Sequence, residues 1–247
     1  TPGYGSVARY WTAYVQNANQ ENQGSYPADP VLILQAMGRK IGFIPAAARL
    51  ADPNREIPMH IYMAEAGFSL EDLYENTVQL VKERKRGILV VGEGMDVGDI
   101  GKVQDSFGHT SFGASQMSVA QIVTNYINER GLPVAGKARC QVSGTDQRGC
   151  INLASNVDLE EAYRLGQKAA QIALEEGSGY MSTIKRTASS IYSVSYDKVP
   201  LEKVANSERT FPKEWLTKEK TDVTNEFVAY ARPLIGEDRV DVPLQNG

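Results

Sequence analysis

The fold of this chain is decided by the stretch Val31-Leu32-Ile33-Leu34-Gln35-Ala36-Met37-Gly38-Arg39. Apart from Gln35, residues 31–36 are apolar, and a short continuous apolar run is typical of a strand buried on both faces of a parallel sheet. The chain then turns at Gly38 into an Ala-rich segment, 41–51, which we expect to be helical in spite of Pro45 near its first turn. A strand that leads directly into a helix is the repeating unit of an α/β fold.

The same alternation recurs along the rest of the chain. The apolar patterns and their Gly, Ser and Asp boundaries predict further strands at 59–64, 88–91, 134–142 and within 182–194. They predict helices at 6–16, 69–86, 118–130 and 158–176, a loop at 17–29, and a packed tail with short helices after about residue 198. We therefore expect an α/β fold with a mostly parallel sheet.

Composition excludes several classes of protein. The chain has 247 residues, 42% of them hydrophobic, which is enough to bury a core. Its net charge of −4 lacks the basic footprint of a general nucleic-acid binder. No apolar run approaches the ~20 residues of a membrane span and no signal peptide opens the chain, so we expect no membrane partner. Two cysteines, Cys140 and Cys150, make no disulfide framework and favour the reducing cytoplasm.

The start of the chain is unusual. It begins at Thr1 without a methionine, and residues 1–6 are typical of a loop that leads into a helix. We therefore expect this chain to be part of a longer protein.

Polar and charged residues gather where the expected strands end. Met37-Gly38-Arg39 follows one strand, Glu65 another and Glu93 a third, while the strand 134–142 carries Arg139 and leads into Thr145 and Arg148. Ligands of open α/β sheets bind outside the carboxyl ends of the strands, so we expect three arginines and two carboxylates on one rim.

This set of residues suits a phosphorylated sugar or polyol. A guanidinium pairs with phosphate oxygens through two parallel bonds, and a carboxylate accepts hydrogen bonds from hydroxyl groups. Gly38 at a helix start would also let backbone N–H groups face an anion. The alternative for each single arginine is an ordinary solvated surface residue, and Glu93 between two glycines is also compatible with a simple turn.

The other motifs in the sequence indicate no specific function. Residues 92–98 miss the dinucleotide-binding pattern by one residue, and the chain has no Walker A sequence. His109 is interpreted as a hydrogen-bonding loop residue and His60 as part of a strand. With two histidines in the chain, a multi-histidine metal site is excluded, and Cys140 and Cys150 lack companions for zinc.

Several of these segments together resemble the phosphofructokinase family. Met37-Gly38-Arg39 with Ile41 to Ala51 is similar to its M-G-R-x-x-G-[FW] segment, Ala64 to Phe68 to its P-E-x-x-F strand end, and Val90 to Gly94 to its E-G strand end. Arg139 and Arg148 resemble its spaced arginines, and Thr1 to Tyr10 the segment that follows its T-I-D-N-D motif. The tail, at Lys203 to Glu208 and Pro212 to Trp215, is most similar to the diphosphate-dependent branch.

The resemblance covers essentially the whole chain and implies a Rossmann-like fold of two lobes, with the donor-binding lobe largely missing. Residues 1–148 would form the fructose-6-phosphate-binding lobe, and 149–247 the return helix to the donor lobe and the C-terminal tail. The implied reaction is phosphoryl transfer from diphosphate to the 1-hydroxyl of fructose 6-phosphate, with Mg²⁺ held by ligands upstream of Thr1. The implied partners are further copies in a homo-oligomer or a companion chain that carries the donor lobe.

The resemblance also implies roles for individual residues. Met37, Gly38 and Arg39 would line the sugar pocket, and Glu93 would accept from a sugar hydroxyl. Arg148 would hold the 6-phosphate beside Thr145, and Arg139 would be supplied across a subunit interface. The catalytic base and the metal carboxylates would lie upstream, so no catalytic residue is assigned within this chain.

Two departures leave alternatives open. Gln35 stands where the family usually has Glu, and Thr145 stands where it has His or Tyr. One alternative keeps the enzyme class and changes the donor to ATP, because the donor loop is not in this sequence. The other is a non-catalytic regulatory subunit that binds sugar phosphate.

Overall fold

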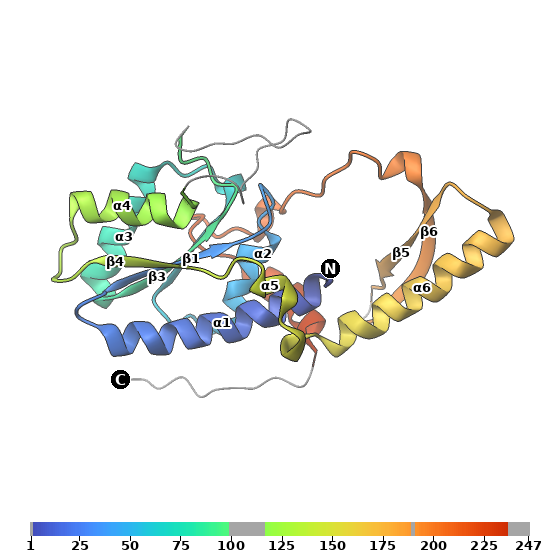
Figure 1. Cartoon of the computed structure of the whole chain (residues 1–247), viewed down its shortest axis with the longest axis horizontal. Helices are drawn as coiled ribbons and strands as arrows, with labels where there is room; N and C mark the ends of the chain where they lie inside the picture. Colours follow the sequence, from blue (N-terminus) through green and yellow to red (C-terminus); the bar gives the residue numbers. More distant parts are fainter. Residues whose placement is uncertain (1, 99–116, 189–190, 237–247) are drawn as a thin grey trace.

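The computed structural model describes residues 2–98, 117–188 and 191–236 (Figure 1). Its helices are α1 (Tyr4–Ser25), α2 (Phe43–Ala46), α3 (Leu70–Arg84), α4 (Val119–Arg130), α5 (Asp146–Gly149), α6 (Asn156–Glu176) and α7 (Asn225–Ala231). Its strands are β1 (Val31–Ala36), β2 (Met59–Tyr62), β3 (Gly87–Gly92), β4 (Ala138–Val142), β5 (Tyr180–Arg186) and β6 (Val194–Pro200). His109 lies outside the described residues.

The first four strands form one parallel sheet in the order β2-β3-β1-β4. Every residue of β1 and β3 is buried, as the continuous apolar runs predict. One core lies between the sheet and α1, the 3₁₀ segment η1 (Ala47–Ala51) and α7, and a second core lies under α3 and α4. The expected α/β fold with a parallel sheet is confirmed.

Helix α3 begins where its local sequence predicts. Ser69 accepts from the backbone N–H of Asp72, whose carboxylate accepts in turn from the Ser69 N–H. This reciprocal pair is a capping box, and it satisfies two N–H groups that the first helical turn leaves free. Leu73, Thr77 and Val81 then face the core, as their spacing predicts.

Two helices differ from expectation. Helix α1 extends to Ser25 instead of ending near residue 16, because polar side chains in its second half are buried and bonded; Asn22, for example, donates to the Asp29 carbonyl. Residues 41–51 form one turn, α2, followed by the 3₁₀ segment η1, and the alanines 46–48 are fully buried. Tertiary packing overrides the helical propensity of this Ala-rich run.

Helix α6 and the strands β5 and β6 extend away from the sheet (Figure 1). Strands β5 and β6 pair as an antiparallel hairpin, and α6 packs against it. The sequence predicts one strand in this region, whereas the structure has two. Along α6 the one buried side chain is Ile172, while Leu159 and Leu174 are exposed. None of the described helices is both long and apolar enough to cross a membrane.

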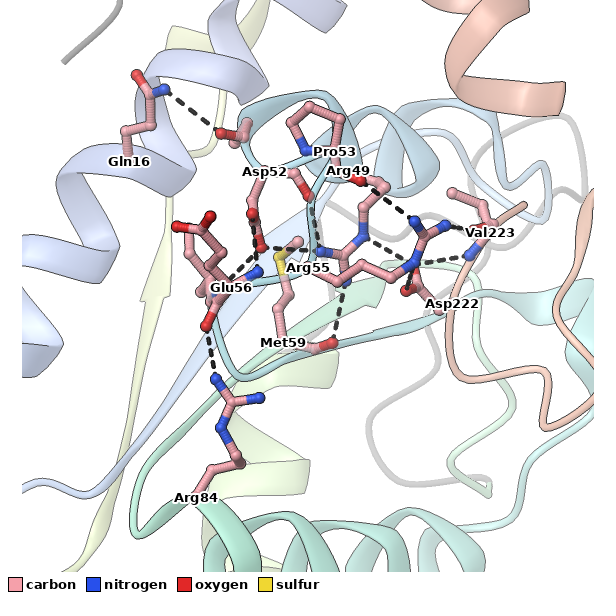
Figure 2. Close-up of polar contacts among 12 residues, drawn as sticks. Gln16, Arg49, Asp52, Pro53, Arg55, Glu56, Met59, Arg84, Asp222 and Val223 are labelled. Carbon is pink, nitrogen blue, oxygen red and sulfur yellow. Dashed lines mark hydrogen bonds and ion pairs between the residues drawn. The ribbon is translucent and has the colours of Figure 1, made fainter. Parts of the chain in front are cut away.

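The tail returns to the sheet, with short helices as expected. Phe211, Trp215 and Phe227 pack against one another, and the Ile61 backbone N–H donates to the Thr221 carbonyl at the edge of β2. The tail is further held by Asp222, which contacts the buried guanidinium of Arg49 (Figure 2). The 211–235 segment is thus part of the core of the sheet domain.

Candidate functional site

The candidate site is built around the turn that follows β1. Gly38 and Arg39 both have positive φ angles, 126° and 52°, so successive backbone N–H groups point to the same side. Glu93, at the end of the neighbouring strand β3, accepts from both of them through one carboxylate oxygen, at 3.0 Å from Gly38 N and 2.9 Å from Arg39 N. A Cβ on Gly94 would lie 1.9 Å from the Arg39 carbonyl oxygen, so this close approach requires glycine.

Gln147 attaches a second loop to the same turn. Its Oε1 accepts from the Met37 backbone N–H at 3.0 Å, and its Nε2 donates to Ser143 Oγ and to the Gly144 carbonyl. The loop after β4, which carries Thr145 and Arg148, therefore lies beside the turn after β1. Sequence reasoning did not select Gln147, because a glutamine in a polar loop carries no local signal.

Glu65 fixes the other side of the turn. Its Oε1 accepts from the Gly42 backbone N–H at 2.9 Å and from the Phe211 backbone N–H at 3.1 Å. Its Oε2 is buried and has no hydrogen-bond partner in the described residues. Glu65 therefore joins the turn to the tail, and the expectation of a second carboxylate free for sugar hydroxyls is wrong.

The expectation that turn N–H groups face an anionic ligand is also wrong. The Gly38 and Arg39 N–H groups are occupied by a carboxylate of the chain itself, Glu93. The second oxygen of Glu93, Oε2, makes no hydrogen bond to any described residue, and Glu93 is half-buried. That oxygen is an acceptor that the described residues leave available at this rim.

Two of the three predicted arginines belong to this rim. Arg39 and Arg148 are exposed, and within the described ranges neither guanidinium makes a hydrogen bond or an ion pair. Thr145 stands at the N-cap of the four-residue helix α5 and is exposed as well. The turn after β1 and the loop after β4 thus carry two guanidinium groups and the Glu93 carboxylate, which are groups that can bind a ligand with an anionic end and a hydroxyl-bearing end.

Arg139 is not on this rim. In β4 it pairs in register with Leu32, the second residue of β1, and so lies toward the opposite end of the sheet from Met37. Its guanidinium forms ion pairs with Asp29 and Glu21. The expectation of three arginines on one rim is therefore wrong for Arg139.

Gln35 has a structural partner. It is 8% exposed and its Oε1 accepts from the Ala120 backbone N–H at 2.9 Å, in the first turn of α4. A neutral amide in this place satisfies a helix N–H group that would otherwise be buried without a partner. A glutamate carboxylate would accept the same bond, so this contact does not explain why glutamine stands here.

Two tyrosines stand beside the Gln147 loop. Tyr10 and Tyr14 stack with ring centroids 5.4 Å apart. Burial raises the pKa of Tyr10, and burial followed by the neighbouring Tyr10 raises the pKa of Tyr14 to about 12. Both phenols therefore keep their protons near neutral pH and add no negative charge beside Arg148.

Two cavities are found elsewhere. One, of about 550 Å³, is lined by Met63, Phe68 and Met95, among others. The other, of about 960 Å³, lies between α6, the β5–β6 hairpin and the start of α1, and Arg186 and Arg209 line it. Neither is lined by any of the site residues predicted from the sequence.

The residues present do not fit a metal site. In the part of the chain that the structure describes, no three His, Cys, Asp or Glu side chains are grouped so that they could hold a metal ion. The rim carboxylates are committed to backbone N–H groups through their Oε1 atoms. No step of the chemistry is therefore assigned to Mg²⁺ on these residues.

Known proteins have sequences similar to that of this chain. The family described as Phosphofructokinase matches residues 1–173. A protein of Methylococcus capsulatus named pyrophosphate–fructose 6-phosphate 1-phosphotransferase is 32% identical, over 96% of this chain and 57% of its own length. A protein of the same name from Halomonas elongata is 30% identical, over 100% of this chain and 59% of its own length.

Solved structures are similar to this chain as well. The pyrophosphate-dependent phosphofructokinase of Nitrosospira multiformis superposes with a TM-score of 0.81 at 32% identity, covering 96% of this chain and 56% of that protein. The chain thus spans little more than half the length of the relatives it matches. With the family pattern matched over more than two thirds of its residues, and with the same sheet, the chain belongs to the phosphofructokinase family.

Proposed function

We propose that this chain carries the fructose-6-phosphate-binding part of a diphosphate-dependent phosphofructokinase, an enzyme that makes fructose 1,6-bisphosphate. One observation carries the proposal. Arg39, Glu93 and Arg148 belong to neighbouring segments at the carboxyl edge of the sheet, because Glu93 binds the Arg39 N–H and Gln147, next to Arg148 in the sequence, binds the Met37 N–H. Both guanidinium groups are free within the described chain, which is what an anionic substrate requires.

Each rim residue has a role in this proposal. Arg148 binds the 6-phosphate, with Arg39 as a second cation and the Thr145 hydroxyl as a further donor. Glu93 Oε2 accepts from a sugar hydroxyl, and Met37 and Gly38 form the wall of the sugar pocket. These residues bind and orient the sugar, and such positioning is a large share of the catalysis of phosphoryl transfer.

The catalytic base, the donor site and any Mg²⁺ ligands belong, in this proposal, to parts of the protein outside the described residues. The names of the relatives favour diphosphate over ATP as the donor. The free cysteines Cys140 and Cys150 agree with a cytoplasmic enzyme. The role of Arg139 at a partner subunit's site also remains a proposal, and it would require Arg139 to leave Asp29 and Glu21.

The non-catalytic alternative keeps both of its reasons. Gln35 and Thr145 differ from the family pattern, and the bond from Ala120 to Gln35 is one that glutamate would also accept. The alternative is decided by the activity of the full-length protein. Turnover with fructose 6-phosphate and diphosphate is expected, and turnover with ATP in its place would reassign the donor.

Calorimetric titration of the full-length protein with fructose 6-phosphate tests the site itself. Arg148→Ala should weaken binding by about 2 kcal/mol, roughly thirtyfold, since it removes a charge-assisted contact, and Arg39→Ala should weaken it in the same direction. Arg84→Ala is the matched control, because Arg84 ends α3 and donates to the Glu56 carbonyl ahead of β2, at the opposite edge of the sheet. Unchanged affinity in both rim variants would reject the proposed site.

A further inference from the structure

Gln147 is a buried glutamine whose amide is fully used. It is 3% exposed. Its Oε1 accepts from Trp11 Nε1 at 3.1 Å and from the Met37 N–H at 3.0 Å, and its Nε2 donates to Ser143 Oγ at 3.1 Å and to the Gly144 carbonyl at 3.0 Å. Both lone-pair directions of the oxygen and both N–H groups of the nitrogen are therefore occupied.

These four bonds join three separate elements. Trp11 lies in α1 and is itself fully buried, Met37 begins the turn after β1, and Ser143 begins the loop after β4. Backbone pairing joins β1 to β4 as far as Gln35 and Val142. Beyond these residues a side-chain bond joins the turn after β1 to the loop after β4. Gln147 supplies that connection.

The loop has no other buried side chain. Within 143–150 every residue except Gln147 is half-buried or exposed, and the helix in it, α5, has one turn. A short, exposed segment of this kind has little packing to hold it in place. Its position relative to Met37 thus depends chiefly on the one amide.

We propose that Gln147 is a positioning residue for the sugar phosphate: it sets the separation between Arg148 and the Met37–Arg39 turn so that both reach one ligand. This inference rests on the proposed function, since the ligand it positions is fructose 6-phosphate. Gln147 does not touch the substrate in this view, and it acts through the backbone of its neighbours.

The test is a comparison of Gln147→Met with Gln16→Met in the full-length enzyme. Methionine fills a similar volume and removes the hydrogen bonds. Gln16 is also a buried glutamine, 8% exposed, and donates to the Ala51 carbonyl away from the rim, so it reports what losing a buried amide does to folding alone. We expect Gln147→Met to raise KM for fructose 6-phosphate about tenfold or more and to leave KM for diphosphate within about twofold. Gln16→Met should leave both constants near wild type.

A spectroscopic signal separates positioning from stability. In the full-length protein labelled with 5-fluorotryptophan, the fluorine resonances of Trp11 and Trp215 are assigned with the variants Trp11→Phe and Trp215→Phe. Saturation with fructose 6-phosphate should shift the Trp11 resonance of the wild type, because its indole shares the Gln147 oxygen with the Met37 N–H. The shift should be lost in Gln147→Met. If that variant does not fold, Gln147→Asn, one methylene shorter, replaces it in both measurements.

The outcomes distinguish the two proposals. A wild type that neither binds nor turns over fructose 6-phosphate rejects the proposed function, and the positioning role with it. An active wild type whose KM for fructose 6-phosphate is unaffected by the Gln147 variants overturns the positioning role alone. The same holds if Gln16→Met raises this KM equally, since the effect would then come from lost stability.

Discussion

Replacing Arg49 with methionine should destabilise this fold more than replacing any exposed arginine. The guanidinium of Arg49 is 1% exposed and lies between two carboxylates, with Nη1 3.1 Å from Asp52 Oδ2 and Nε 2.9 Å from Asp222 Oδ1 (Figure 2). Its remaining N–H groups donate to the carbonyls of Asp52 and Met59. Methionine would fit much of the space and remove every one of these bonds.

The expected loss of unfolding free energy depends on the hydrogen bonds that Asp52 and Asp222 retain in the variant. Removing one member of a buried ion pair costs about 3–5 kcal/mol, because the partner charge stays buried. Asp52 retains the N–H groups of Glu56 and Ile57, at 3.0 and 2.8 Å, and Asp222 retains Arg55 at 3.2 Å. We therefore expect Arg49→Met to lower the free energy of unfolding by about 3 kcal/mol, the lower end of that range. For a chain of this size such a loss lowers Tm by about 6–12 °C.

Urea unfolding of the two variants Arg49→Met and Arg84→Met compares how much each lowers the free energy of unfolding. Arg84 is exposed and donates to one backbone carbonyl, that of Glu56, so its loss should change the free energy of unfolding by about 0.5 kcal/mol or less. The Arg49 effect should also persist at high salt, since buried pairs are poorly screened. A loss for Arg49→Met no larger than that for Arg84→Met would refute the reasoning.

Three further changes have defined outcomes. Gly94→Ala would place a Cβ 1.9 Å from the Arg39 carbonyl oxygen and should displace the turn, so affinity for fructose 6-phosphate should fall by about tenfold or more in calorimetry; unchanged affinity would count against the turn as part of the site. Ser69→Ala removes the α3 capping box and should cost about 1 kcal/mol in urea unfolding, and an unchanged midpoint would contradict that cap. Burial lowers the pKa of His60 below its ordinary 6.5, so its contribution to stability is full above pH 6.5 and is lost as the pH falls through the lowered pKa. The free energy of unfolding of His60→Gln should accordingly fall less than that of the wild type between about pH 7 and pH 5. Equal falls in the two proteins would show that His60 does not cause the loss of stability.

The sheet and its covering helices were predictable because their signals are local. The apolar runs of β1 and β3 and the cap at Ser69 are visible in a few consecutive residues. The second half of α1 was missed because Asn19 and Asn22 look like loop residues and yet are buried. Their burial depends on partners such as Arg86, which donates to Asn22 from far along the chain.

The sequence predicted which loops lie together at the carboxyl edge of the sheet, and not the contacts between them, for the same reason. Strand order along the sequence indicated that Arg39, Glu93 and Arg148 share an edge. The position of Arg139 depends on where β4 begins: a strand that starts at 134 puts it near the middle, whereas the observed start at Ala138 puts it at the far end. Gln147 was not predictable, since its partners Trp11 and Met37 lie more than a hundred residues away.

The hydrogen bonds of the turn also constrain how a sugar phosphate can lie on the rim. In a phosphate-binding loop, backbone N–H groups bind the anion, but here the N–H groups of Gly38 and Arg39 bind the carboxylate of Glu93. In the proposed site a phosphate placed against that carboxylate would be repelled, so we expect the phosphate end to point toward Arg148 and the hydroxyl-bearing end toward Glu93 Oε2. Recognition by a guanidinium fork in place of backbone amides also means that lysine at position 148 would not reproduce the contact, because it cannot pair bidentately. In this proposal the Glu93 carboxylate determines which way the ligand lies. The loop that Gln147 holds in place carries the residue that binds the anionic end.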